Sequence, residues 1–195
     1  GEQVSADEAA PPWRPMRVAA LEGHKVIAGG VGATHSAALT ANGALYTWGS
    51  NAEGQLGLLD CLKTSAEGNG TCQTHALTSP AAADTPQPVE AFRVWDAHNV
   101  SQGQRGFTRG AELRAVRVEA IGIGWYYTLA LGADGQVYSW GYGVNGQLGL
   151  PRRQHFQSPD VRIVNMPTAV RALEGASIYS LHASRHHSGA VTRDG

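Results

Sequence analysis

The sequence has little charge, few aromatic residues and only two cysteines. Its 15 basic and 16 acidic side chains give a formal net charge of -1, so no positive field favours nucleic acid or an anionic membrane. Two cysteines, with no Cys-x-x-Cys pair, are too few for a disulfide-rich scaffold and suggest no zinc or redox site. No apolar run reaches the roughly 18 residues that a membrane span needs. The 195 residues, 42% of them hydrophobic, are enough to bury a core.

Glycine, in contrast, is abundant. The chain contains 25 glycines, well above the usual share of roughly 7% of residues. Because glycine adopts turn conformations that other residues resist, this composition favours many short strands over long helices.

Two motifs recur 92 residues apart and reveal an internal repeat. They are Gly-x-x-Tyr-x-Trp-Gly, at 43–49 and 135–141, and Gly-Gln-Leu-Gly-Leu, at 54–58 and 146–150. A third copy begins near the end of the sequence, where 187–195 matches 35–43. Its distance from the second copy is only 60 residues, so the basic unit has 60 residues and the earlier spacing includes insertions.

Pro-x-x-Val segments at 15–18, 86–89 and 167–170 mark where each unit starts. The chain therefore divides into an N-terminal arm or linker over 1–14 and three units that occupy about 15–58, 86–150 and 167–195. Insertions of 11 and 21 residues account for the unequal spacing, and they fall near 59–85 and 93–112.

Within each unit, the pattern is that of antiparallel strands. Asn42-Gly43 separates the expected strands 36–40 and 44–48, and this dipeptide predicts a type I′ turn. Along 44–48 and 136–140, Leu or Val alternates with Tyr and Trp, which predicts that both strand faces are partly covered. Residues 26–28 and 116–121 predict a further strand, and Pro-x-x-Val a fourth. Four short strands whose faces stack on their neighbours indicate propeller blades rather than a sandwich.

The string Gly-x-x-His-Ser-x-x-Leu-Thr-x-x-Gly-x-Leu-Tyr-x-Trp-Gly-x-Asn-x-x-Gly-Gln-Leu-Gly at 32–57 resembles the repeat of the regulator of chromosome condensation family. The resemblance covers about 15–195 and implies a seven-bladed β-propeller. Ser184 stands where the other units have Gly32 and Gly124, and Tyr127-Thr128 replaces the His-Ser pair. We expect an all-β fold with about three four-stranded blades of the seven.

Seven units would need roughly 420 residues. We therefore expect the remaining blades to come from residues beyond this sequence or from another polypeptide.

The sequence offers little catalytic chemistry. Gly-x-Gly-x-x-Gly at 141–146 follows an expected strand, but no helix start follows it, so we interpret it as a repeat turn. His182, His186 and His187 lack acidic or cysteine residues at ligand spacing, and in a strand the last two would face opposite ways. We expect His35 and His187 to bond neighbouring backbone. No nucleophile elbow, Walker loop or zinc-protease motif occurs. We predict no catalytic residue, cofactor or metal.

The first insertion contains Cys61, Cys72 and His75, whose spacing permits a disulfide or a metal clip and requires neither. Glycosylation patterns begin at Asn69 and Asn99, at a frequency that chance explains, so they do not indicate secretion.

The second insertion carries the candidate partner-binding residues. Trp and Arg are frequent interface anchors, and loops on rigid repeats commonly hold binding specificity. The candidates are Trp95, Arg105, Phe107 and Arg109. The alternative is that Trp95 and Phe107 pin the loop to its own blade.

These observations favour a non-catalytic protein–protein interaction module or scaffold within a multi-subunit complex. The resemblance also implies an alternative, guanine-nucleotide exchange on a small GTPase, for which no residue-level match transfers. Gly-Trp-Tyr-Tyr-Thr at 124–128 resembles the Gly-Trp-Arg-His-Thr motif of the plant ultraviolet-B photoreceptor, but it occurs once and lacks the Arg and His. We expect an intracellular protein, and the sequence does not distinguish cytoplasm, nucleus, cilium or organelle.

Overall fold

The structure, a computed structural model, describes residues 15–58, 82–90, 92–95, 111–151 and 163–194. Nearly all of its regular structure is β-strand, and two single-turn 3₁₀ helices, η1 (Ala19–Leu21) and η3 (Arg171–Leu173), precede β1 and β11. The expectation of an all-β fold is confirmed.

The strands form three sheets. Blade 1 contains β1 (Val26–Val31), β2 (His35–Thr40), β3 (Leu45–Ser50) and β4 (Ala82–Pro88), in that order. Blade 2 contains β7 (Val118–Ile123), β8 (Tyr127–Gly132), β9 (Val137–Tyr142) and β10 (Ile163–Ala169), and the hairpin of β5 (Phe92–Trp95) and β6 (Ala111–Arg114) extends its outer edge. The described part of blade 3 is β11 (Ile178–Ala183) and β12 (Ser188–Thr192).

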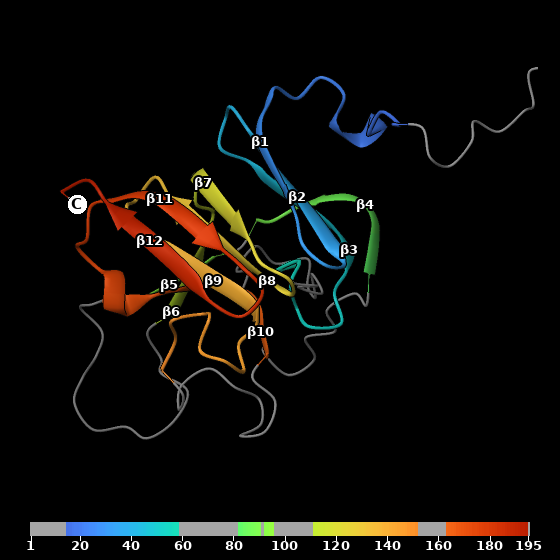
Figure 1. Cartoon of the computed structure of the whole chain (residues 1–195). Coiled ribbons are helices and arrows are strands. Elements are labelled where there is room, and N and C mark those ends of the chain that lie inside the picture. The colour runs from blue at the N-terminus through green and yellow to red at the C-terminus, as the bar shows by residue number, and fades with distance from the viewer. Residues whose placement is uncertain (1–14, 59–81, 91, 96–110, 152–162, 195) are drawn as a thin grey trace, which may run out of the picture.

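The three blades stack face to face, as blades of a propeller do. Figure 1 shows β11 and β12 on one side of β7, β8 and β9, and β1, β2 and β3 on the other. The second and third Pro-x-x-Val segments close a sheet, because Pro86 lies in β4, which pairs with β3, and Pro167 lies in β10, which pairs with β9. The first segment, at 15–18, forms no strand, so the expectation of a strand there is wrong. The sheets are therefore offset from the repeat units of the sequence.

The prediction of a type I′ turn at Asn42-Gly43 is wrong by one residue. The N–H of Gly43 donates to the carbonyl of Thr40 (2.8 Å), and the N–H of Thr40 donates to the carbonyl of Ala44 (3.0 Å). Three residues thus form the loop, and its last one, Gly43, has φ of 85°. In this arrangement a tight turn is followed by a bulge, so the glycine takes the left-handed position at its end. Gly135 ends the same kind of loop in the second unit: its N–H donates to the carbonyl of Gly132 (2.9 Å), and its φ is also positive.

One backbone carbonyl joins blade 2 to blade 1. The indole Nε1–H of Trp140 donates to the carbonyl oxygen of Gln55 (2.9 Å), and the hydroxyl of Thr128 donates to the same oxygen (3.0 Å). A Cβ at Gly57 would lie 2.6 Å from the indole Nε1, so only glycine leaves room for the ring. This contact explains why the Trp-Gly and Gly-Gln-Leu-Gly motifs recur together.

The next pair of blades repeats the hydroxyl contact. Ser188, which occupies the position of Thr128 in the repeat, donates to the carbonyl of Gln147 (2.6 Å). Tyr127 also reaches forward, since its hydroxyl donates to the carbonyl of His187 (2.7 Å) and accepts from the N–H of Ser184 (3.1 Å). The exchange of His for Tyr in the second unit is therefore accommodated by the backbone of blade 3.

The innermost strands also approach closely. A Cβ built on Gly30 in β1 would lie 2.5 Å from Cγ1 of Ile123 in β7, so the isoleucine occupies the space that a side chain would need. The approach of β7 to β11 is less tight, since a Cβ built on Gly122 would lie 3.5 Å from the Cβ atoms of Leu181 and Ala183, an ordinary contact distance. Small residues near the axis let successive blades pack without a gap.

His35 is buried between blades 1 and 2, with 3% of its surface exposed. Its Nε2 lies 3.0 Å from the Thr128 hydroxyl. Because that hydroxyl uses its single proton on Gln55, His35 must donate from Nε2, and its Nδ1 has no hydrogen-bond partner. The expectation of a backbone partner for this ring is wrong. Burial lowers the pKa of His35 from 6.5 to about 4, because the charged ring would lose its hydration.

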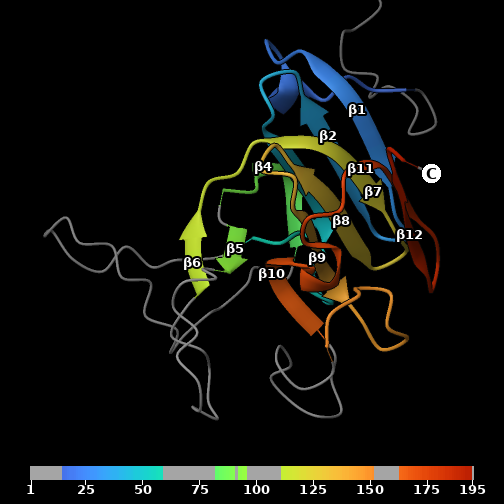
Figure 2. The ribbon, with the colours of Figure 1, turned by 90° about the vertical axis from the view of Figure 1, so that its left-hand side faces the viewer.

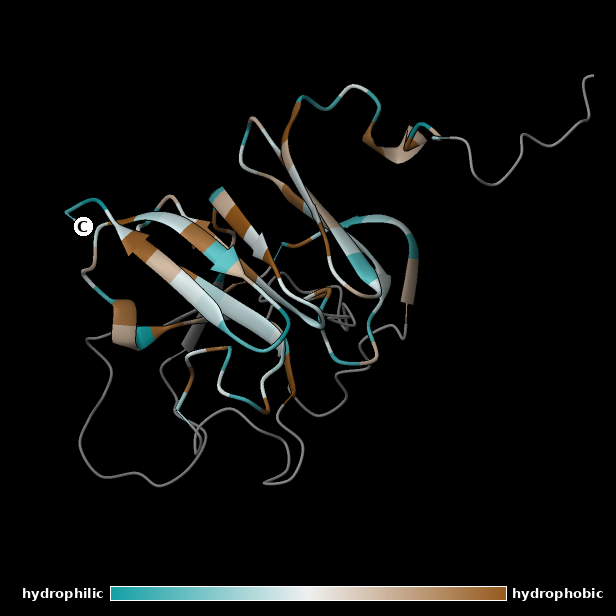
Figure 3. Cartoon of the chain, viewed as in Figure 1, coloured by the Kyte–Doolittle hydropathy of each residue, from teal (hydrophilic) through white to brown (hydrophobic). Residues whose placement is uncertain are grey.

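Burial follows the stacking order. Every residue of β8 is buried, and so are the first five of β9, whereas β1 and β11 expose large apolar side chains, among them Val31 (77%) and Tyr179 (64%). Blade 2 is thus covered on both faces, as the alternation of its residues predicts. Figure 3 shows hydrophobic colours along the strands and hydrophilic ones at several of the turns.

We predict that Gly30→Ala destabilises the chain by about 1–3 kcal/mol, because its Cβ overlaps Ile123. In the double variant with Ile123→Ala, the loss should be smaller than the sum of the two single losses, as urea unfolding would measure. Gly29→Ala is the matched control on the same strand, since a Cβ there meets only Ala37 at an ordinary 3.6 Å. Strict additivity of the two losses would contradict the packing.

We also predict that His35 makes the chain less stable in acid. Between pH 6.5 and about 4, the unfolded chain binds a proton that the folded chain does not, so the free energy of unfolding falls by about 3 kcal/mol as pH decreases. Above pH 6.5 the ring is neutral in both states, and below about pH 4 the loss levels off. His35→Gln should remove this fall in urea unfolding, while the exposed control His182→Gln should keep it; the reverse pattern would contradict the assignment.

Candidate functional site

The second insertion builds a hairpin on the outer edge of blade 2. Strand β5 pairs in parallel with β10, where Arg93 lies opposite Thr168, and in antiparallel fashion with β6, from Phe92 opposite Arg114 to Trp95 opposite Ala111. Figure 2 shows β5 and β6 at the margin of the molecule farthest from β11 and β12. The insertion is therefore a structured extension of the sheet at both of its ends.

Phe92 anchors the hairpin in the core. Its side chain has no exposed surface, and its ring meets Tyr138 edge to face with the centroids 5.1 Å apart. A second edge-to-face contact joins it to Trp140 at 6.3 Å. Such pairs add to the stabilisation that burial of the ring provides. Phe92 thus packs on the same tryptophan that binds the Gln55 carbonyl.

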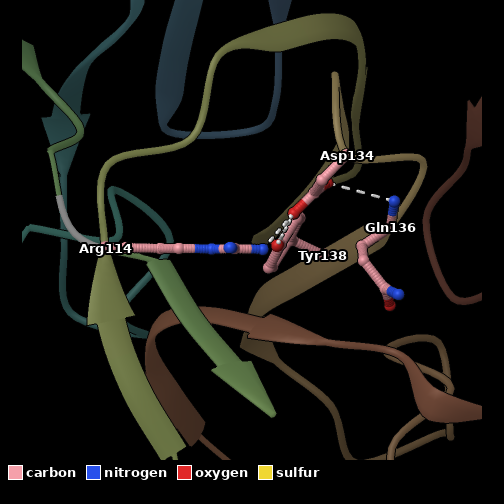
Figure 4. A network of polar contacts seen from close by, with 4 residues as sticks. All are labelled: Arg114, Asp134, Gln136 and Tyr138. Carbon is pink, nitrogen blue, oxygen red and sulfur yellow. Dashed lines mark hydrogen bonds and ion pairs between the residues drawn. The ribbon is translucent and has the colours of Figure 1, made fainter. Parts of the chain in front are cut away.

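A polar network fixes the other strand of the hairpin (Figure 4). Arg114 of β6 donates to Oδ2 of Asp134 (3.1 Å), and the hydroxyl of Tyr138 donates to the same oxygen (2.7 Å). The other oxygen of Asp134 accepts the N–H of Gln136 (3.1 Å). Burial raises the pKa of Tyr138, and the bond to Asp134 raises it further, so the phenol stays a donor near neutral pH.

The hairpin places the candidate residues as follows. Trp95 is the last residue of β5, while Arg105, Phe107 and Arg109 lie outside the described residues, between β5 and β6 in the chain. The choice between partner contact and internal packing for Trp95 and Phe107 stays a prediction. Sequence reasoning missed both anchors, Phe92 and Arg114, although Phe92 immediately precedes the insertion and is apolar.

The first insertion lies largely outside the described part of the chain. This includes Cys61, Cys72 and His75, whose pairing stays open, and the glycosylation pattern that begins at Asn69. The pattern that begins at Asn99, in the second insertion, also lies outside it.

Of the three histidines considered for metal binding, His182 lies in β11, and the other two lie at a turn. His186 and His187 belong to the turn between β11 and β12, so the expectation of opposite strand faces is wrong for them. The carbonyl of His187 accepts from Tyr127, as described above, and its side chain is exposed. Among the described residues, no group of three or more His, Cys, Asp or Glu could hold a metal ion.

The Gly-x-Gly-x-x-Gly stretch forms a turn. The N–H of Gly146 donates to the carbonyl of Gly143 (3.1 Å), and the side chain of the buried Gln147 accepts the N–H of Asn145 (2.9 Å). From 143 to 151 the chain contains no helix that could cradle a phosphate. Within the described ranges, no helix has the length and apolar character of a membrane span.

Comparisons with known proteins agree with this architecture. A model of the regulator of chromosome condensation (RCC1) repeat matches residues 42–105 and 134–191, and a second model of the repeat matches 26–55 and 118–147. The E3 ubiquitin-protein ligase HERC2 of Homo sapiens is 30% identical over 223 residues, covering 100% of this chain and 4% of that protein. RUG3, a mitochondrial RCC1 domain-containing protein of Arabidopsis thaliana, is 31% identical, covering 93% of this chain and 43% of that protein.

Solved structures show the same fold. Prp20p of Saccharomyces cerevisiae superposes with a TM-score of 0.55 at 17% identity, covering 88% of this chain and 32% of that one. Yeast RCC1 (Prp20) bound to Kap60 superposes with a TM-score of 0.55 at 22% identity, and the match covers 87% of this chain and 30% of that one. The chain spans less than half the length of each of these relatives. With two repeats matched by the family model and the interlocking blades observed, the chain belongs to the regulator of chromosome condensation repeat family, whose fold is the β-propeller.

Proposed function

We propose that the chain is a non-catalytic protein–protein interaction module within a multi-subunit complex, and that the hairpin of β5 and β6 presents its partner-binding loop. The observation that carries this proposal is the double anchoring of the hairpin, by Phe92 in the core and by Arg114 on Asp134. Trp95, Arg105, Phe107 and Arg109 are the proposed contacts.

The anchors matter because binding requires ordered groups. A loop whose two ends are held by a sheet loses less conformational freedom when a partner binds than a loop on a free tether. Trp and Arg dominate the residues that contribute most to interfaces, and this insertion carries both. A structured extension of one blade, absent from the shorter third unit, is therefore well suited to a partner.

The relatives support a binding role, and the roles that they have differ from one another. One solved structure contains yeast RCC1 (Prp20) bound to Kap60. Another is described together with the binding properties of Prp20p to Gsp1p and histones. Another relative, UVR8 of Arabidopsis thaliana, 29% identical over 93% of this chain, is an ultraviolet-B receptor. Different roles on one fold fit a rigid frame whose loops determine what it binds.

We predict that the double variant Trp95→Ala with Arg105→Ala lowers the recovery of partners that co-purify with the full chain at least about tenfold. The reason is that the loss of one hot-spot residue costs about 2 kcal/mol or more of binding free energy. Phe92→Ala should also reduce partner recovery, with a stability loss of about 3–5 kcal/mol. The matched control is Tyr179→Ala with Arg193→Ala, an exposed ring and arginine on blade 3, which should retain the partners.

Recovery of every partner by the Trp95 and Arg105 variant, quantified by mass spectrometry, would contradict the proposal. The second candidate, exchange on a small GTPase, is favoured by the fold shared with Prp20p. Accelerated release of labelled nucleotide from a GTPase by the full chain would replace the non-catalytic role with this one.

A further inference from the structure

The turns between β7 and β8 and between β11 and β12 bring exposed aromatic rings and a cation together. Trp125, 38% exposed, lies beneath Arg185, whose guanidinium carbon is 3.7 Å from the ring centroid. Tyr126 and His186 lie beside it, with ring centroids 5.9 Å and 6.4 Å from the Trp125 ring. Tyr142 follows at 6.5 Å from Tyr126. We call these five residues the Trp125 cluster.

The cluster presents hydrogen-bond donors for which the described residues supply no carboxylate. The Arg185 guanidinium carries five N–H donors, and in the described part of the chain no carboxylate pairs with it. The Nδ1 of His186 lies 3.2 Å from Nδ2 of Asn145, which can only donate. Nδ1 is therefore the acceptor, and the neutral ring carries its proton on Nε2.

This geometry fits a carboxylate. A guanidinium presents parallel N–H groups that match the two oxygens of a carboxylate, and His186, beside the same indole, brings a further N–H donor to the cluster. The exposed indole and Tyr126 supply an apolar surface for the residue next to it. Trp, Tyr and Arg are also the residues most enriched at the energetic centres of protein interfaces.

A carboxylate of an acidic peptide suits the charge of the site better than a nucleic acid does. The cluster contains one arginine, and the whole chain has a formal net charge of -1. Nucleic acids are held by several cations that neutralise successive phosphates.

We propose that the Trp125 cluster is a second docking site, which binds an acidic segment of a partner protein through Arg185 and His186. This inference rests on the proposed role as an interaction module, but the site is built by different turns from the hairpin that carries Trp95. One chain would thus contact partners through the edge of blade 2 and through the junction of blades 2 and 3.

The test is a nuclear magnetic resonance titration of the full chain, which follows the indole N–H of Trp125, assigned with Trp125→Phe. The probes are hexaglutamate, hexaglutamine, inorganic phosphate and a single-stranded oligothymidine. We expect a saturable shift with hexaglutamate alone. Arg185→Gln should weaken binding about tenfold. Arg185→Lys should weaken it less, because lysine keeps the positive charge but lacks the parallel N–H donors of a guanidinium.

Arg193→Gln is the matched control, because it removes the same charge from the same blade at an arginine that lies over Tyr179 instead. It should leave the affinity unchanged. The proposal is overturned by the absence of a saturable shift, by equal binding of hexaglutamine, by equal weakening from Arg193→Gln, or by tighter binding of phosphate or oligothymidine. Backbone amide spectra report whether each variant is folded. If Arg185→Gln does not fold, Arg185→Lys is used to measure the loss of affinity. If these probes fail while the Trp95 and Arg105 variant still loses its partners, this site is wrong and the proposed function stands.

Discussion

The carbonyl of Gln55 is the contact on which the stacking of the first two blades depends. It accepts both the indole N–H of Trp140 and the hydroxyl of Thr128, and these groups are buried. If the blades separated without water reaching them, the donors and the carbonyl would lose their partners, which costs more than one ordinary hydrogen bond contributes. The side chain of Gln55 shapes its own turn by accepting the N–H of Glu53 (2.8 Å). A single glutamine thus fixes both the turn and the neighbouring blade.

The proposed functional parts are attached to this frame. Phe92 packs on Trp140, so the hairpin rests on the residue that links blades 1 and 2. The Trp125 cluster exists because blade 3 places Arg185 over a ring of blade 2. Both surfaces therefore need the stacked blades in order to keep their geometry, although neither contributes a residue to the Gln55 contact.

The repeat made most of the fold predictable from sequence. The alternation around Tyr46 and Tyr138, flanked by turn glycines, predicts strands that the structure contains as β3 and β9. The turn at Asn42 was misplaced because the same dipeptide suits two loops that differ by one residue. The anchors could not be found in this way. Arg114 meets Asp134 only after the hairpin has joined blade 2, and Trp125 meets Arg185 only after blades 2 and 3 have stacked. The repeat motif leaves these four positions unspecified, so it predicts neither pair.

Hydrogen exchange of the tryptophan indoles tests the interlock most directly, because the repeat supplies its own reference. Trp48 holds the same position in blade 1 as Trp140 in blade 2, and its indole makes no hydrogen bond to the described residues. Our account predicts that in this chain the Trp140 indole exchanges only when the blades separate or the chain unfolds, whereas that of Trp48 exchanges far faster. Equal exchange rates for the two indoles would contradict it.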